Sequence, residues 1–139
     1  MKNSTEAATN GTILIGCSEK DMQHALSEFI ERNLDRRVLC VSETSDLLLE
    51  VLDKQVHLTI IDINLKGLPI TKTIQLVKKC RPRVPVIVLS DDYSVATGSS
   101  IMEHGVFYYM YKPLDMHSFK EIIVSALKKR AREESEERR

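Results

Sequence analysis

The sequence lacks several features that would place it in a familiar class of protein. Its 20 basic and 20 acidic residues cancel, so no excess of positive charge indicates direct binding to nucleic acid. No apolar run reaches the length of a membrane span, and the first residues lack the apolar core of a signal peptide. We therefore expect a cytoplasmic protein that contacts neither nucleic acid nor membrane directly.

Cysteine and histidine are also too few and too scattered for a disulfide framework or a metal cluster. The chain has three cysteines, an odd number without zinc-like spacing, so we expect reduced thiols. Its four histidines fall on different predicted elements. At 139 residues the chain suits one domain with a real core and is short for two.

What the sequence does contain is a regular alternation of short apolar runs with segments of helical periodicity. Strands are expected at 12–16, 37–41, 58–62, 84–89 and 106–111. Helices are expected from about residue 20, around 47–52, at 70–79, at 94–104 and around 119–127. This alternation predicts an α/β fold, a flavodoxin-like (βα)5 doubly wound parallel sheet with strand order 2-1-3-4-5.

The ends of the chain differ in composition from this central part. Residues 1–10 are polar and aperiodic, which predicts a disordered tail. Residues 11–128 form the predicted domain. Residues 129–139 are almost entirely charged, and they either prolong the last helix into solvent or form the stub of a linker.

Three of the predicted strands each lead into one polar residue that can handle phosphate. These residues are Asp62, Ser90 and Lys112. Ligands of an open α/β sheet bind just outside the carboxyl ends of its strands, so the three side chains should meet at one edge of the fold. A carboxylate can attack a phosphoryl group and hold it as an acyl phosphate, which makes Asp62 the first candidate.

The segment Asp62-Ile63-Asn64-Leu65-Lys66-Gly67, together with Ser90 and Lys112-Pro113, resembles the response regulator receiver domain of two-component signalling. The resemblance covers roughly residues 11–128. It implies that Asp62 is the phosphoacceptor, that Ser90 binds a phosphoryl oxygen and that Lys112 pairs with Asp62 or with the phosphate. A receiver is a signalling domain and not an enzyme, beyond autocatalytic phosphoryl transfer to Asp62.

The resemblance also implies a switch and partners. Tyr109 is similar to the aromatic residue of receivers that turns inward when the hydroxyl is drawn to the phosphate. With Tyr108 and Tyr111 it suggests a surface for a partner, because tyrosine is favoured at interfaces. The implied partners are a histidine kinase or phosphotransfer protein and a downstream protein or output domain, and a homodimer is compatible with the same surface.

One departure from the receiver pattern concerns the metal. Receivers usually follow the first strand with two acidic residues that hold Mg²⁺, and this chain has Cys17 and Ser18 there. Asp62, the backbone carbonyl of Asn64 and, one position after the usual pair, Glu19 remain as candidate ligands, so we expect weak or absent Mg²⁺ binding. Asp91 is a second departure, since receivers usually have a small residue directly after the hydroxyl.

Two other functions are compatible with parts of this pattern. A phosphorylation-independent interaction module, or pseudo-receiver, would keep the fold and the tyrosine surface without the chemistry. A flavodoxin-like cofactor enzyme would need a Thr- or Gly-rich phosphate loop after the first strand, which the segment 16–20 does not provide.

Overall fold

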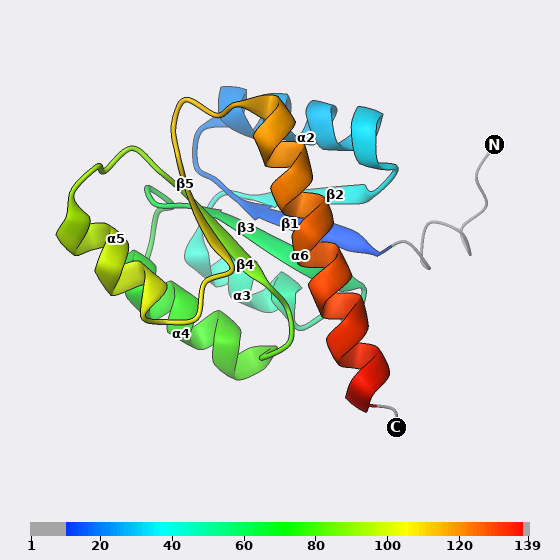
Figure 1. Ribbon diagram of the computed structural model, residues 1–139. Coiled ribbons are helices and arrows are strands. Elements are labelled where there is room, and N and C mark those ends of the chain that lie inside the picture. Colours follow the sequence, from blue (N-terminus) through cyan, green and yellow to red (C-terminus); the bar gives the residue numbers. More distant parts are fainter. Residues whose placement is uncertain (1–10, 138–139) are drawn as a thin grey trace.

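The computed structural model describes residues 11–137, and the predicted N-terminal tail lies outside them. Its centre is one sheet of five parallel strands in the order β2-β1-β3-β4-β5 (Figure 1). The strands are β1 (Thr12–Gly16), β2 (Arg37–Val41), β3 (Val56–Asp62), β4 (Val86–Ser90) and β5 (Tyr108–Tyr111). The flavodoxin-like fold and the strand order expected from the sequence are confirmed.

Five helices cover the two faces of the sheet (Figure 1). They are α2 (Lys20–Leu34), α3 (Thr44–Val51), α4 (Ile70–Cys80), α5 (Val95–Met102) and α6 (Met116–Glu137). One buried cluster joins α2 and α6 to the sheet, and a second joins α3, α4 and α5 to the opposite face. Successive side chains of a strand point to opposite faces, so each of the central strands contributes to both clusters.

The last two strands along the chain begin later than their apolar runs suggest. β4 starts at Val86, because Pro85 has no N–H to donate to a neighbouring strand. The Pro85 carbonyl nevertheless accepts a hydrogen bond from the N–H of Thr59 at 3.0 Å. β5 starts at Tyr108, two residues after the predicted start.

The charged segment at the C-terminus continues α6 without a break as far as residue 137. Ion pairs one helical turn apart accompany this extension, including Lys129 Nζ to Glu133 Oε1 at 3.7 Å and Arg130 to Glu134 at 2.5 Å. Pairs at this spacing support an exposed helix by a few tenths of a kcal/mol each, ~0.3–0.5. The described part of this segment is therefore helical.

The loop between β3 and α4 lies directly against the start of α3. Gly67 has φ +120°, and a Cβ there would come within 2.7 Å of Thr44 Oγ1, so only glycine allows this close approach. The Thr44 N–H donates to the carbonyl of Lys66 at 2.9 Å, and Thr44 Oγ1 accepts from the N–H of Leu68 at 3.2 Å. These contacts fix the loop that follows Asp62.

Candidate functional site

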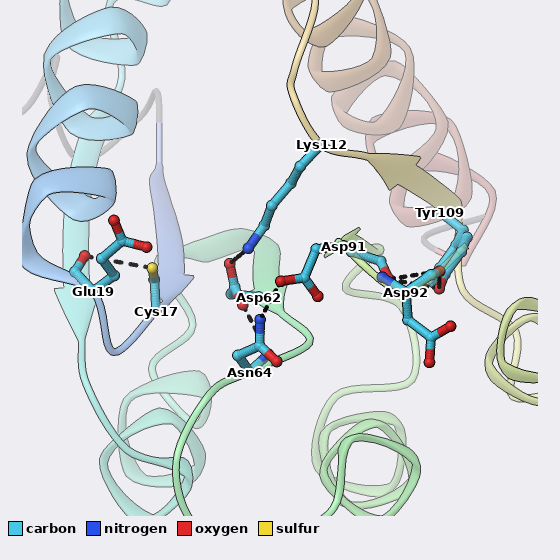
Figure 2. A network of polar contacts seen from close by, with 9 residues as sticks. Cys17, Glu19, Asp62, Asn64, Asp91, Asp92, Tyr109 and Lys112 are labelled. Carbon is cyan, nitrogen blue, oxygen red and sulfur yellow. Dashed lines mark hydrogen bonds and ion pairs between the residues drawn. The ribbon is translucent and has the colours of Figure 1, made fainter. Parts of the chain in front are cut away.

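The ends of β3, β4 and β5 lie next to one another in the sheet and bring three predicted site residues together. Asp62 ends β3, Ser90 ends β4, and Lys112 follows β5 directly. The Lys112 N–H donates to the Ser90 carbonyl at 2.9 Å, which fixes the start of the loop after β5. Lys112 Nζ lies 2.6 Å from Asp62 Oδ2, as Figure 2 shows.

Asp62 is an almost completely buried carboxylate whose two oxygens have different partners. Its side chain is only 5% exposed, which would be costly for an unpaired charge. Oδ2 pairs with Lys112, and Oδ1 accepts a 2.7 Å hydrogen bond from the N–H of Asn64. Removing one partner of such a pair typically costs about 3–5 kcal/mol, so each charge holds the other in place.

Asp91 stands at the mouth of this site on the β4 side. Its Oδ2 accepts a 3.1 Å hydrogen bond from the side-chain amide of Asn64 (Figure 2). Asp91 therefore adds a second carboxylate near Asp62, and the Asn64 amide lies between the two. The Asp91 carboxylate is exposed to solvent.

Ser90 is completely buried, and its hydroxyl is part of a compact network with Tyr109 and Asp92. The Tyr109 hydroxyl donates to Ser90 Oγ at 2.7 Å and lies 3.1 Å from the Asp92 carbonyl oxygen. Ser90 Oγ accepts from the Asp92 N–H at 2.9 Å and donates to the Asp92 carbonyl at 3.2 Å. Tyr109 thus points inward and contacts the hydroxyl that the sequence analysis assigned to phosphate.

Asp92 connects the same network to the start of α5. Its Oδ1 accepts from the N–H of Ser94 at 2.9 Å and its Oδ2 from the Thr97 hydroxyl at 2.9 Å. These hydrogen bonds lower the pKa of Asp92 below its usual value, with the Ser94 N–H making the largest contribution. The sequence analysis did not select Asp92, although an Asp followed by Ser two residues later is a typical helix-start signal.

The tyrosines of β5 divide between the two faces of the sheet. Tyr109 and Tyr111 pack edge to face with ring centroids 5.3 Å apart, and Tyr93 packs on Tyr111 at 5.2 Å. Tyr108 instead lines a groove beside α6. The predicted single tyrosine surface is therefore two surfaces, and Tyr93, which sequence reasoning missed, belongs to the one that contains Tyr109. Strand alternation gave the signal for this division.

Cys17 and Ser18, the residues at the usual metal positions, contact other parts of the protein instead. The Cys17 side chain is buried, and its Sγ lies 3.6 Å from the Glu19 carbonyl oxygen. Burial raises the pKa of the Cys17 thiol, so it stays protonated. Ser18 Oγ donates to the Ser42 carbonyl at 2.7 Å and accepts from the Lys66 N–H at 2.9 Å, which joins three loops.

The remaining oxygen groups do not fit a magnesium site. A cavity of about 230 Å³ lies over Asp62 and is also lined by Cys17, Glu19, Asn64 and Lys66. Mg²⁺ requires near-octahedral oxygen ligands, but a protonated thiol and a lysine occupy this cavity and both Asp62 oxygens have other partners. Among residues 11–137, no group of three or more His, Cys, Asp or Glu side chains is placed to hold a metal ion.

Within residues 11–137, no helix combines the length and the apolar character that crossing a bilayer requires.

Comparison with known proteins shows the same architecture in receivers. A curated relative, the DNA-binding transcriptional regulator NtrC of Azospirillum brasilense, is 28% identical over 84% of this chain, which spans 24% of the relative's length. The CheY-like receiver domain protein of Methanospirillum hungatei JF-1 has a TM-score of 0.82 at 20% identity, covering 88% of this chain and 98% of that one.

One similar receiver structure contains magnesium. The receiver domain of the sensor histidine kinase PA1611 from Pseudomonas aeruginosa PAO1 has a magnesium ion coordinated in its active-site cleft. It has a TM-score of 0.76 at 18% identity and covers 85% of this chain and 98% of its own.

The family model of the response regulator receiver domain matches residues 13–124. This chain therefore belongs to the response regulator receiver domain family of two-component signalling.

Proposed function

We propose that Asp62 accepts a phosphoryl group from a histidine kinase or a phosphotransfer protein. The observation that carries the proposal is the 2.6 Å ion pair between Lys112 Nζ and Asp62 Oδ2 at the meeting point of three strand ends. An Asp62 oxygen would attack phosphorus while the bond to the donor histidine breaks, which gives an acyl phosphate and releases the imidazole. Lys112 is placed to pair with the added negative charge.

Ser90 and Tyr109 supply a route from this group to the protein surface. A phosphoryl oxygen on Asp62 would attract the Ser90 hydroxyl proton, which now points to the Asp92 carbonyl. That carbonyl still has the Tyr109 hydroxyl as a donor at 3.1 Å, so the tyrosine proton can take the place of the serine proton. Phosphorylation would thereby change the balance of hydrogen bonds that holds Tyr109 and the start of α5.

The proposed output is the surface formed by Tyr93, Tyr111 and Val95. Their exposed fractions are 62%, 44% and 82%, which is high for large apolar or aromatic side chains. A downstream protein, an output domain or a second copy of the chain would bind there. Since the chain spans about a quarter of the curated relatives, an output domain in the same polypeptide is part of this proposal.

No step of the proposal uses Mg²⁺, because the cavity over Asp62 does not present the ligands that this ion needs.

The three cysteines are free thiols, which supports a reducing compartment such as the cytoplasm. The family match does not favour a phosphorylation-independent module over phosphoryl acceptance.

Incubation with acetyl phosphate followed by intact-mass measurement tests the proposal. We expect one added phosphoryl group in the unaltered chain and none in Asp62→Asn, because the amide that replaces the carboxylate is a poor nucleophile. Asp46→Asn is the matched control, since Asp46 is an exposed aspartate in the first turn of α3 and should leave labelling unchanged. Labelling that persists in Asp62→Asn would move the phosphosite elsewhere.

A further inference from the structure

The charge around Asp62 differs from that of receivers with an acidic pair. Cys17 and Ser18 stand where two carboxylates usually lie, and a thiol and a hydroxyl are neutral at pH 7. This chain therefore has two fewer negative charges beside Asp62, and Mg²⁺ carries two positive ones. A thiol and a hydroxyl without the ion give the same net charge as two carboxylates with it. The replacement thus removes the charge that the ion would balance.

Lys66 lines the cavity over Asp62 together with Lys112. The backbone of Lys66 is held on both sides. Its N–H donates to Ser18 Oγ at 2.9 Å, and its carbonyl accepts from the Thr44 N–H at 2.9 Å and from the Thr44 hydroxyl at 3.0 Å. The loop after β3 therefore fixes the point from which the Lys66 side chain starts.

The ammonium group of Lys66 is available to a ligand. The residue is exposed, and its Nζ makes no hydrogen bond or ion pair within residues 11–137. Glu19 lines the same cavity and Glu43 lies opposite Lys66 in an isolated parallel bridge, yet neither forms an ion pair with it. Lys112, by contrast, already contacts Asp62 Oδ2 at 2.6 Å. The cavity thus has one engaged cation and one free cation.

Phosphorylation of Asp62 would create a need for the second cation. An acyl phosphate carries about one negative charge more than the carboxylate it replaces, and it adds three oxygens that accept hydrogen bonds. Lys112 offsets the charge of the carboxylate alone. A second ammonium group can offset the added charge, because several phosphoryl oxygens can each accept from a different lysine.

We propose that Lys66 supplies positive charge to the transferred phosphoryl group, so that Asp62 is phosphorylated without a divalent cation. This inference rests on the proposed function. With acetyl phosphate as donor, an Asp62 oxygen forms a bond to phosphorus while the bond from phosphorus to the acetate oxygen breaks. Acetate leaves with the bonding electron pair, and the step requires no proton transfer. Lys66 contacts the phosphoryl oxygens during the transfer and Lys112 pairs with the product.

The rate of labelling by acetyl phosphate, followed by intact mass in Mg²⁺ and in excess EDTA, tests this inference. For the unaltered chain we expect the two rates to agree within about twofold. Lys66→Gln should lower both rates about tenfold, because one charge-assisted contact to the phosphoryl group is lost. Lys66→Arg keeps the charge and should recover most of the rate. Lys79→Gln is the matched control, since it removes an exposed lysine in the last turn of α4, and its rate should be unchanged.

Cys17→Asp supplies the opposite case. Its added carboxylate should slow labelling in EDTA, because it repels the anionic donor, and Mg²⁺ should restore the rate by at least about tenfold.

Three results would contradict the inference in different ways. Labelling of the unaltered chain that is more than about twofold faster in Mg²⁺ than in EDTA would overturn it and leave the proposed function intact. Equal rates in the unaltered chain and in Lys66→Gln, or equal losses in Lys66→Gln and Lys79→Gln, would overturn the role of Lys66. No labelling under either condition would overturn the proposed function and this inference with it.

Discussion

At the scale of single residues, Ser18 shows how a lost metal position can acquire a different role. Its hydroxyl donates to Ser42 and accepts from Lys66, so the three loops around the cavity depend on one side chain that can do both. A carboxylate at this position could still accept from Lys66, but it would face the Ser42 carbonyl without a proton to donate. Placing acidic residues at both positions, as in typical receivers, should therefore lower the stability of the fold. Replacing Cys17 alone leaves the Ser18 hydrogen bonds in place.

We accordingly expect different results for the two replacements. Cys17→Asp should tighten Mg²⁺ binding, because a carboxylate gives this hard cation a charged oxygen ligand. Adding Ser18→Asp should lower the free energy of unfolding by about 1–3 kcal/mol through the unsatisfied Ser42 carbonyl. Calorimetric Mg²⁺ titration and urea unfolding measure the two effects. Tight Mg²⁺ binding by the unaltered chain, with no gain in Cys17→Asp, would show that Glu19 or Asp91 already completes the site.

Thr59 is a buried polar residue without a partner. Its side chain in β3 is fully buried, and its Oγ1 is the one buried side-chain oxygen or nitrogen within residues 11–137 that makes no hydrogen bond. Thr59→Val keeps the shape and removes the unsatisfied hydroxyl, so it should raise the stability by about 1 kcal/mol. Urea unfolding should show a higher midpoint with an unchanged slope, and a lower midpoint would contradict the assignment.

His57 makes the stability depend on pH. Burial, and then the charges of Arg130 and Arg36, lower the pKa of His57 from 6.5 to about 4. The unfolded chain therefore binds a proton below about pH 6.5 that the folded chain does not bind until about pH 4. The contribution of neutral His57 to the free energy of unfolding is fully present above pH 6.5. It falls by at most roughly 3 kcal/mol as the pH drops to 4.

Melting curves of the unaltered chain and of His57→Gln across this pH range test the linkage. The glutamine variant cannot take up a proton, so its melting temperature should fall less steeply between pH 6.5 and 4. Identical pH profiles for the two proteins would remove His57 as the cause.

At the scale of elements, the sequence indicated most of the site because parallel strands end at one edge. Asp62, Ser90 and Lys112 could each be placed at a strand end, and the strand order then made them neighbours. Strand alternation places Tyr108 and Tyr109 on opposite faces of the sheet, whereas the sequence analysis expects a single tyrosine surface. The place of Lys66 in the lining of the cavity over Asp62 could not be predicted, because Ser18 and Thr44, far from Lys66 in the sequence, fix the loop that carries it.

α5 is the element through which we expect the site to act. It begins at Val95, and Asp92 and Ser94 hold its first turn by hydrogen bonds that also involve the Tyr109 network. Hydrogen bonds among Ser90, Asp92 and Tyr109 connect the end of β4 with the first turn of α5, so we expect a signal to reach α5 through these residues.

Tyr109→Phe tests this route at the level of one hydroxyl. The ring stays in place for packing on Tyr111, while the hydrogen bonds to Ser90 and the Asp92 carbonyl are lost. We expect acetyl-phosphate labelling of Asp62 to persist and the response of the Tyr93 and Tyr111 surface to decrease, as followed by tyrosine resonances. An undiminished response would show that the tyrosine hydroxyl is not the link.

At the scale of the whole molecule, the two ends of the sheet carry different groups. One end holds the buried Asp62–Lys112 pair and the network that leads to α5, and the other holds a cavity beside the extended α6 whose lining includes Lys78, Lys129 and Glu133. The sheet between them is buried on both faces, which keeps the strand ends in a fixed relation. We therefore expect a change at Asp62 to reach the proposed partner surface without rearranging the core.

The most direct test of this account is the NMR response to beryllofluoride, a mimic of the phosphoryl group. A bound mimic on Asp62 should shift the amide resonances of Ser90, Tyr109 and α5 as well as those of the immediate neighbours of Asp62. The shifts should be stronger in Cys17→Asp and absent in Asp62→Asn. The contradicting result is a mimic that binds Cys17→Asp but perturbs only the immediate neighbours of Asp62 and leaves Tyr109 and α5 unchanged.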